Sequence, residues 1–368
     1  MTARAHYLDV ASSEPLHPAA REMFLAALDR GFADPRRLHD VARDARLMLD
    51  NARAVVAECL DVRADEISFV ASGTEAVHRG LLGLASAASS PRRRIALTSV
   101  EHAAVRHAAD WWGESVLLGV DAQGRIDAED ALARAVEEEC TVVAVQTANH
   151  EVATLQPVDE LDLPDDLPLF VDACASMGRL PLPRRWSALA GSAHKWGGPA
   201  GVGVLVVRHG AAWQSPFPTD DRVDHRTTGF ENVPAALAAA AALQAVCAER
   251  EETNRRQHAQ IERIRSAAAA LPDSEVVGDP ELRLPHLATF SCLYVNGEAI
   301  VSALNRRGFG VASGSACTTS TLEPSHVLAA MGALTHGNVR VSVGRSTTDA
   351  DVDRFCAALP EALAEVRS

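Results

Sequence analysis

Three features of membrane, secreted and metal-binding proteins are missing from this sequence. It contains no run of about 18 or more apolar residues, since the alanine-rich segment after Pro234 is interrupted at Glu249-Arg250-Glu251-Glu252. The N-terminus has no basic region followed by an apolar stretch. The seven cysteines are an odd number without regular spacing or a metal-type Cys-x-x-Cys pair, which fits a reducing compartment. We therefore expect a soluble, cytoplasmic protein with no membrane partner and no metal site.

Clustered positive charge is also scarce. The formal net charge is −14, and Arg92-Arg93-Arg94 is the only tight basic run. Binding to a nucleic-acid backbone requires clustered lysine and arginine, so we expect no nucleic-acid partner.

The chain is longer than one typical core requires, with 368 residues and neither an internal repeat nor a low-complexity linker. Between about residues 67 and 207, short β-branched runs alternate with helical stretches, a pattern typical of a mostly parallel sheet covered by helices. The expected strands are Ile67–Val70, Ile95–Thr98, Val142–Gln146, Leu169–Asp172, Leu189–Ser192 and Val202–Val207.

The C-terminal part of the chain predicts a second, smaller α+β domain. A long helical region from Pro234 to about Leu271 is expected to connect the two domains. The expected elements after it are strands at Leu287–Tyr294 and Val339–Val343 and helices at Glu298–Arg307 and Ala350–Arg367. We place the large domain at residues 16–250 and the small domain at residues 1–15 and 251–368.

Polar residues follow the ends of the predicted strands, where ligands bind in such sheets. They are Thr74, His102, Asn149, Asp172 and Lys195. Their shared position predicts one binding site at this edge of the sheet.

Lys195 and Asp172 indicate covalent cofactor chemistry. Lys195 stands in the glycine-rich turn Ser192-Ala193-His194-Lys195-Trp196-Gly197-Gly198-Pro199. Lysine is a poor choice for so tight a turn unless its amine has a function, for example to attach an aldehyde cofactor. The alternative interpretation is a solvated surface lysine. Asp172 ends an apolar strand, where a buried carboxylate needs a cationic partner; a cap for the next helix is the alternative.

The turn Ala71-Ser72-Gly73-Thr74-Glu75 follows a strand and opens a helix. The free N–H groups and the positive end of the helix dipole then point at one spot, which suits a phosphate. A simple helix cap is the alternative reading.

Cys317 differs from the other cysteines because Ser313-Gly314-Ser315-Ala316-Cys317-Thr318 isolates it among small, flexible residues. Reactive thiols favour partly exposed loops of this kind, whereas a buried structural thiol is the usual alternative. The other six cysteines lie in apolar or amphipathic runs and are expected to be structural: Cys59, Cys140, Cys174, Cys247, Cys292 and Cys356.

These motifs, with Asn338-Val339-Arg340-Val341-Ser342-Val343-Gly344-Arg345 and the pair Glu101-His102, resemble those of the cysteine desulfurases. That family belongs to the class V aminotransferase group of pyridoxal 5'-phosphate (PLP) enzymes. The resemblance extends from Tyr7-Leu8-Asp9 to the final helix. It implies the α/β fold of PLP-dependent transferase fold type I, with a mostly parallel seven-stranded sheet between helices and a smaller α+β C-terminal domain.

The resemblance also implies a role for each matching residue. Lys195 would attach PLP, Asp172 would pair with its ring nitrogen, and His102 would stack on the ring and shuttle protons. Gly73, Thr74, Ser192 and His194 would hold the phosphate. Arg340 would clamp the substrate carboxylate, and Cys317 would take the sulfur of L-cysteine as a persulfide. Glu323 and His326 are left as helix-start and packing residues. A sulfur acceptor protein and a homodimer follow as expected partners.

Four positions depart from the family pattern. Ala175 stands where the family has a glutamine that contacts the phenolic oxygen of PLP, and His150 replaces the second asparagine of Asn-Asn-Glu. Phe230 replaces a threonine that reaches the phosphate in the partner subunit. Asp34 replaces an asparagine and would repel a nearby substrate carboxylate. Each loss removes a hydrogen bond worth about 1 kcal/mol, while His150 would replace part of the lost contact to the phenolic oxygen.

Two other readings remain open from the residues. One is another class V activity, namely a selenocysteine lyase, a β-lyase or an aminotransferase, which would make Cys317 dispensable. The other is a degenerate homologue that acts as a regulatory or binding subunit and holds PLP poorly.

Overall fold

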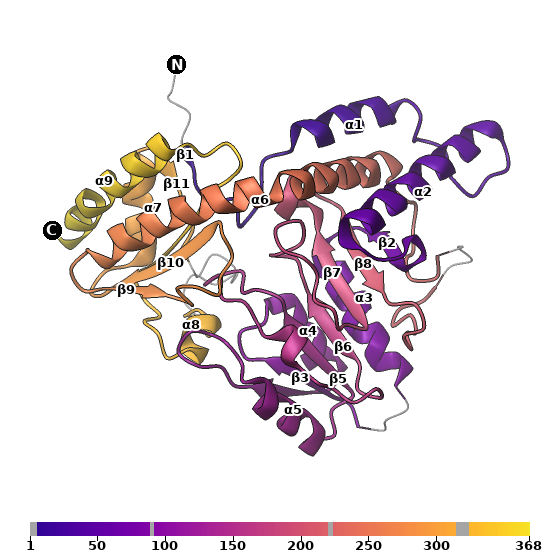
Figure 1. The fold of residues 1–368 in the computed structure, drawn as a ribbon, viewed down its shortest axis with the longest axis horizontal. Helices are drawn as coiled ribbons and strands as arrows, with labels where there is room; N and C mark the ends of the chain where they lie inside the picture. The colour runs from indigo at the N-terminus through magenta and orange to yellow at the C-terminus, as the bar shows by residue number, and fades with distance from the viewer. Residues whose placement is uncertain (1–5, 89–91, 220–223, 314–323) are drawn as a thin grey trace.

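The computed structural model describes residues 6–88, 92–219, 224–313 and 324–368. Figure 1 shows a large sheet among helices on one side of the molecule and a smaller sheet with its own helices on the other. The long helix α6 (Val233–Ala269) runs across both.

The large sheet has seven strands in the order β2-β8-β7-β6-β5-β3-β4. Its strands are β2 (Ile67–Val70), β3 (Arg94–Thr98), β4 (Glu114–Leu118), β5 (Val142–Gln146), β6 (Leu169–Asp172), β7 (Ala188–Ser192) and β8 (Gly203–Val207). Five of them, from β4 to β7 in this order, pair in parallel, and β8 runs antiparallel to both β7 and β2. The mostly parallel seven-stranded sheet predicted from the sequence is therefore confirmed.

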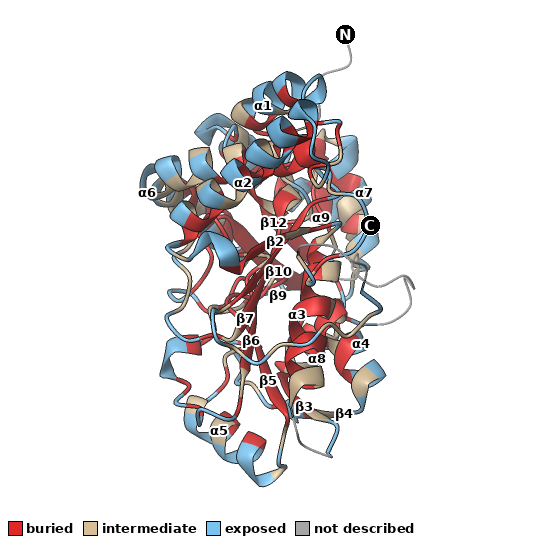
Figure 2. Ribbon diagram, turned by 90° about the vertical axis from the view of Figure 1, so that its right-hand side faces the viewer, coloured by how far each residue is buried: buried red, intermediate tan, exposed pale blue. Residues whose placement is uncertain are grey.

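Alternation along the central strands builds a core on each face of the sheet. In β6, Leu169 and Val171 face one hydrophobic cluster and Phe170 faces the other. The helices α3 (Gly73–Ala87) and α4 (Ala103–Trp112) supply the cluster around Phe170. The opposite face is covered by α1 (Pro18–Leu28), α2 (Asp40–Leu60), α5 (Ala128–Glu137) and α6. Figure 2 shows the strands as buried ribbons between these two helical layers.

The edge strand β4 was not predicted from the sequence. Of its five residues, Val116 and Leu118 are buried while Glu114 and Leu117 are exposed. An edge strand with one wet face has a weaker hydrophobic signal than the buried strands beside it.

The smaller sheet is antiparallel and has the order β12-β10-β9. Its strands are β9 (Ser274–Val277), β10 (Leu287–Cys292) and β12 (Asn338–Ser342). The helices α7 (Gly297–Arg306) and α9 (Asp349–Arg367) share a separate core with it, and α8 (His326–Ala330) is a short helix. The expected strand at Leu287–Tyr294 ends earlier, because the turn that follows holds exposed Tyr294 at a φ of 64°.

The first strand β1 (His6–Tyr7) pairs with β11 (Phe309–Gly310) of the small region. The N-terminal residues and the C-terminal third of the chain thus meet in one place. The exact boundaries of 16–250 for the large domain, and of 1–15 with 251–368 for the small one, stay predictions.

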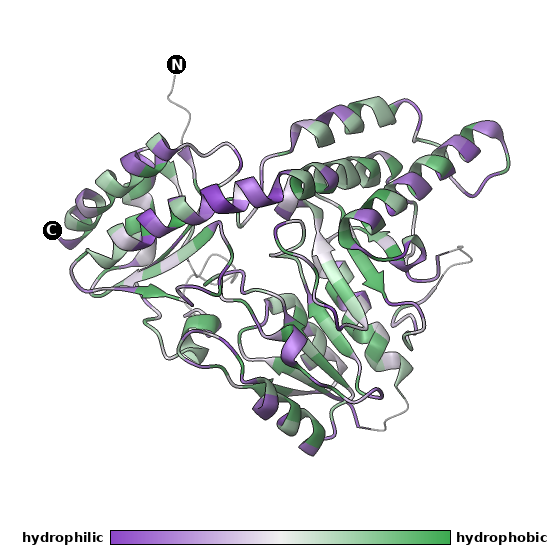
Figure 3. Cartoon of the chain, in the orientation of Figure 1, coloured by the Kyte–Doolittle hydropathy of each residue, from purple (hydrophilic) through white to green (hydrophobic). Residues whose placement is uncertain are grey.

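Helix α6 joins the two regions, as expected for the connector. Figure 3 shows it changing along its length from hydrophobic to hydrophilic. Among the described helices, α6 alone is long and apolar enough to cross a bilayer by length and composition, and half of its most apolar window is buried. A core helix passes the same test, so this is weak support for a membrane span.

The contact between α3 and the sheet predicts an unusual glycine requirement. A Cβ atom at Gly80 would lie 2.6 Å from the ring of Phe170. We expect Gly80→Ala to lower the free energy of unfolding by about 1–3 kcal/mol, although alanine favours helices. Urea titration measures the loss, and Ser86→Ala on the same helix is the control. An unchanged or higher stability of Gly80→Ala would show that α3 has room to shift.

Candidate active site

A cavity of about 170 Å³ lies at the carboxyl ends of β5, β6 and β7, beside the N-terminus of α3. Its volume is close to that of cavities that hold one aromatic ring. Its walls are formed by Gly73, Thr74, Val77, His102, Ala104, Gln146, Ala148, His150, Asp172, Cys174, Ala175, Ser192, His194 and Lys195. The structure therefore brings together the lysine, the aspartate, both histidines and the turn residues that the sequence singled out.

Lys195 and Asp172 reach the cavity from adjacent strands. Asp172 is the last residue of β6, only 7% exposed, and its Oδ1 accepts the backbone N–H of Cys174 at 2.9 Å. Lys195 lies in a 3₁₀ turn (Ala193–Trp196) directly after β7, and its Nζ donates to the carbonyl oxygen of Ala11. The close parallel pairing of β6 and β7 thus aims an amine and a carboxylate into one cavity.

The N-terminus of α3 and the end of β7 form a cradle for an anion. Ser72 caps the helix by accepting the N–H of Glu75 at 3.0 Å. The Ser192 Oγ lies 3.2 Å from His194 Nδ1. A Cβ atom at Gly73 would stand 2.6 Å from the Ser192 Cβ and 3.2 Å from the Cys174 sulfur. Only glycine lets α3 start this close to β7. The positive end of the α3 dipole and its free N–H groups then face the Ser192 hydroxyl.

The neutral ring of His102 is held in one tautomer. It caps α4, and its Nδ1 accepts the N–H of Ala104 at 3.1 Å, so the proton of the neutral ring is assigned to Nε2. Burial lowers the pKa of His102, Lys195 lowers it further, and Asp172 opposes both. The ring is therefore mostly neutral near pH 7 and offers an N–H donor.

His150 packs edge-on against His102, with ring centroids 4.9 Å apart. Burial, with His102 and Lys195 nearby, lowers the pKa of His150 well below its ordinary value. Its Nδ1 is buried and has no hydrogen-bond partner among the described residues. A polar atom of this kind at a cavity wall is suited to a ligand.

Glu101 does not line the cavity but bonds to Gln146, which does. It is fully buried, and its Oε1 accepts the Thr98 hydroxyl at 2.8 Å and the Gln146 N–H at 2.7 Å. Burial, with Asp172 nearby, raises the pKa of Glu101 well above its ordinary value. Glu101 is therefore held towards its protonated, neutral form.

Arg340 is near the cavity but does not line it. The guanidinium of this buried β12 residue donates to the His150 carbonyl at 3.1 Å, to Asp9 at 3.0 Å and to Ser12 at 2.5 Å. Its Nε is buried without a partner. It is therefore fixed behind His150, where substrate contact would require it to exchange one of these partners.

Asp34 does not join the site in this chain. It lies in the segment between α1 and α2, where Arg36 holds it at 2.7 and 2.8 Å and Arg37 at 3.4 Å. The hydrogen bond from Arg36 lowers the pKa of Asp34. Within one chain, Arg36 and Arg37 neutralise the charge that was expected to repel a substrate carboxylate.

Cys317, with Glu323, lies outside the described residues. Phe230, in contrast, is described and 58% exposed, away from the cavity walls.

Cys174 is the site residue that the sequence reasoning missed. It was expected to be structural, yet it lines the cavity, and its thiol hydrogen-bonds Asp172. Burial, with Asp172, raises the pKa of Cys174 well above its ordinary value, so the thiol acts as a donor and not as a nucleophile. Its position two residues after the strand-terminal aspartate was the available signal.

The donor set fits a phosphorylated aromatic aldehyde. The anion cradle at Gly73 and Ser192 admits no side chain, Asp172 suits a protonated ring nitrogen, and Lys195 suits the aldehyde. Ala175 leaves the place of the expected glutamine without a polar side chain, and the unpartnered His150 Nδ1 lies at the same cavity.

Known proteins resemble the chain over nearly its whole length. Residues 6–355 match the family described as aminotransferase class-V. An IscS-like cysteine desulfurase from Mycobacterium tuberculosis is 33% identical, covering 98% of this chain and 97% of its own. The cysteine desulfurase IscS of Dictyoglomus turgidum is 31% identical over 99% and 96%. A solved NifS-like protein superposes with a TM-score of 0.90 at 25% identity, covering 98% of this chain and 100% of its own.

The buried Glu151, next to His150, generates a pH-dependent prediction. Its Oε2 accepts the Ser325 hydroxyl at 2.9 Å, its Oε1 has no partner, and burial raises its pKa from 4.5 to about 7. A raised carboxyl pKa makes the folded state bind a proton in that window, so this group's contribution to stability falls as pH rises from 4.5 to about 7.

We expect Glu151→Gln to remove this loss. Relative to the parent protein, its free energy of unfolding should gain roughly 1–3 kcal/mol between about pH 5 and pH 8. Urea titrations across that range measure the difference, and Glu137→Gln on the exposed face of α5 is the matched control. A difference independent of pH would mean that Glu151 is ionised throughout.

Proposed function

The chain belongs to the class-V aminotransferase family, and from this premise we propose that it is a PLP-dependent cysteine desulfurase. It would convert L-cysteine to L-alanine and keep the sulfur as a persulfide on Cys317. The observation that carries the proposal is the single cavity in which Lys195, Asp172, His102 and the anion cradle meet. The names of the relatives agree with it.

The residues that would hold PLP are those of the cavity. Lys195 would attach the aldehyde, Asp172 would pair with the ring nitrogen, and Gly73, Thr74, Ser192 and His194 would surround the phosphate. Bound PLP supplies an electron sink that makes the α-proton of an amino acid acidic. The cradle provides backbone N–H groups and hydroxyls, which is the chemistry that a phosphate dianion needs.

The chain's own residues would manage the protons. Lys195 Nζ can move the α-proton because its turn directs the amine into the cavity. His102 presents its Nε2–H there, because Nδ1 is occupied by the N–H of Ala104. Cys174 donates its thiol hydrogen bond to Asp172, which helps to hold that carboxyl group in place.

The sulfur step would use Cys317 as the nucleophile. Its thiolate attacks the substrate sulfur, the S–S bond forms, and the C–S bond breaks with its electron pair left on carbon. Protonation of that carbon completes L-alanine, so that L-cysteine and a thiol become L-alanine and a persulfide without an external oxidant. A sulfur acceptor protein would then take the terminal sulfur.

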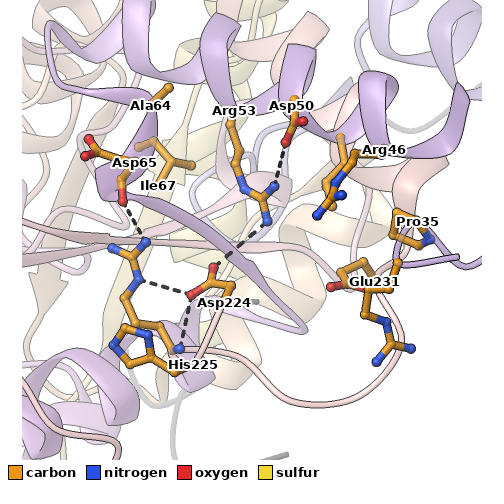
Figure 4. Close-up of a pocket in the computed structure, with 13 residues that line it drawn as sticks. Pro35, Arg46, Asp50, Arg53, Ala64, Asp65, Ile67, Asp224, His225 and Glu231 are labelled. Carbon is orange, nitrogen blue, oxygen red and sulfur yellow. Dashed lines mark hydrogen bonds and ion pairs between the residues drawn. The ribbon is translucent and has the colours of Figure 1, made fainter. Parts of the chain in front are cut away.

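A homodimer is the proposed assembly. Seven large apolar residues on α1, the segment after it and α2 are exposed, as is Phe230: Met23, Leu25, Leu28, Phe32, Leu38, Val41 and Leu47. These segments meet at a pocket of about 590 Å³. Figure 4 shows Pro35, from the segment between α1 and α2, near Glu231 from the loop of Phe230, with His225 of the same loop on the other side of the pocket. There Arg53 extends between Asp50 and Asp224. Exposed apolar residues in such number suit an interface with a second copy of the chain.

A reducing compartment such as the cytoplasm also fits. Among the described residues, Cys59, Cys140, Cys174, Cys247, Cys292 and Cys356 are all free thiols.

The test of the proposed function separates the nucleophile from the cofactor. Loaded with PLP, Cys317→Ser should keep the visible absorbance of the cofactor and its change on adding L-cysteine. It should release less than about 1% of the parent's sulfide in the presence of a reductant, since only the nucleophile is lost. Lys195→Ala should lose both properties, and Cys140→Ser, half-buried elsewhere, should keep both. Parent-like sulfide release from Cys317→Ser would favour a lyase instead.

The assembly has its own test. We expect Phe32→Glu to shift the protein from twice the chain mass toward the single chain in sedimentation, because it buries a charge in an apolar interface. Phe32 is 67% exposed, and Tyr294→Glu, at a residue that is 88% exposed in the small region, is the control. A single-chain mass for the parent protein at micromolar concentration would refute the homodimer.

A further inference from the structure

Cys59 and Cys247 form a pair of thiols between two helices. Cys59 lies in the last turn of α2, and Cys247 faces it from α6, which packs along α2. The Cys247 sulfur is 4.0 Å from the Cys59 carbonyl oxygen, and the two thiols hydrogen-bond each other. Both side chains are partly exposed. Residues 188 positions apart in the sequence thus bring two thiol groups together between the helices.

The two thiols have pKa values shifted in opposite directions. The hydrogen bond from Cys59 lowers the pKa of Cys247 to about 7, against burial and with help from Arg250. The same hydrogen bond, with burial, raises the pKa of Cys59. The C-terminal end of α2 opposes a thiolate at this pair, because its dipole is negative there. Arg250, one turn after Cys247 along α6, favours the thiolate. A sizeable thiolate fraction on one member and a thiol on the other is the arrangement that supports thiol–disulfide exchange.

Both cysteines line an open pocket of about 680 Å³ with a cationic rim. Arg208 and Arg250 line it together with Arg63 and Arg184, against the acidic Asp61 and Glu66. Arg63 is paired with Asp65 at 2.8 Å and Arg184 with Asp159 at 3.8 Å. Glu66 is turned inward, since it accepts the backbone N–H groups of His209 at 2.6 Å and Arg63 at 2.9 Å. Arg208 is stacked on Trp186, with its guanidinium carbon 4.0 Å from the ring centroid. The rim therefore favours a small molecule that carries carboxylates.

This pocket is separate from the cavity of Lys195. Trp186 precedes β7 and Arg208 follows the reversed strand β8. The pocket thus lies at the amino end of β7, whereas Lys195 follows the carboxyl end of the same strand.

We propose that Cys59 and Cys247 are a dithiol site that reacts with anionic low-molecular-weight disulfides of the glutathione class. The Cys247 thiolate attacks one sulfur of the disulfide, forms a mixed disulfide and releases one thiolate. Cys59, after losing its proton to solvent, attacks the Cys247 sulfur and releases the second. The two cysteines are oxidised to one bridge between α2 and α6, and the small disulfide is reduced to two thiols.

The test uses the full-length protein in a Cys317→Ser background, which removes the other thiol expected to react. With oxidised glutathione, the protein should lose two thiols without gaining bound glutathione, and peptide mapping should recover Cys59 linked to Cys247. Adding Cys59→Ser should trap glutathione on Cys247. Adding Cys247→Ser should slow any reaction at Cys59 by about tenfold or more, because that thiol then lacks its low-pKa partner. Cys140 and Cys356 in the same digest are the internal controls.

Three further readouts do not depend on the folding of a variant. Phenylarsine oxide, which needs two neighbouring thiols, should block both cysteines of the parent protein at one equivalent. Bridging so long a loop should raise the midpoint of thermal unfolding by roughly 4 °C. Oxidised glutathione should react several-fold faster than the uncharged hydroxyethyl disulfide, with a preference that shrinks in high salt. Retention of both thiols, glutathione on the parent's Cys247 without a bridge, or equal rates for the two disulfides would overturn the proposal.

Discussion

The close approach of α3 to the sheet is the constraint on which the candidate site depends. Gly73 leaves no space for a side chain against Ser192, and Gly80 leaves none against Phe170. The helix is therefore pinned at its start and at its middle to strands β7 and β6. Its N-terminal N–H groups, the hydroxyl of Ser192 and the turn that carries Lys195 then occupy one small volume. A looser contact would separate the anion cradle from the lysine.

Burial sets the charge state of this volume. Glu101, Glu151 and Cys174 are pushed towards their protonated forms, and His102 and His150 towards neutrality. Asp172 and Lys195 thus meet a ligand in a cavity whose other titratable neighbours are held towards their neutral forms. In such a low-dielectric cavity, electrostatic interactions are screened less than in water. Neutral surroundings thus do as much for the site as the charged residues themselves.

Sequence reasoning predicted the buried strands well. Val142–Gln146 and Leu169–Asp172, which are buried on both faces, have the bounds seen in the structure, as does the edge strand Ile67–Val70. Lys195, Asp172 and His102 follow their strands as expected. The edge strand β4 and the short β9 carry weaker patterns and were missed. Pairings across the sequence escaped too: neither Arg340 behind His150 nor Cys174 beside Asp172 follows from periodicity, which says which way a residue faces and not what it meets. Cys59 against Cys247 is the same case, because two amphipathic helices do not by themselves reveal their register.

The length of helix α6 fixes the rotation of the small region relative to the large one about the helix axis. It has 37 residues and packs in both hydrophobic cores. In an α-helix each residue adds about 100° of rotation and 1.5 Å of rise. Loss of a single residue from its middle would swing the small region about the helix axis by about a quarter turn. The bond from Arg340 to the His150 carbonyl, which spans the two regions, could not survive that rotation. The number of residues in α6 thus sets the relative orientation of the two regions. Point substitutions along its exposed face are tolerable, whereas insertions and deletions are not.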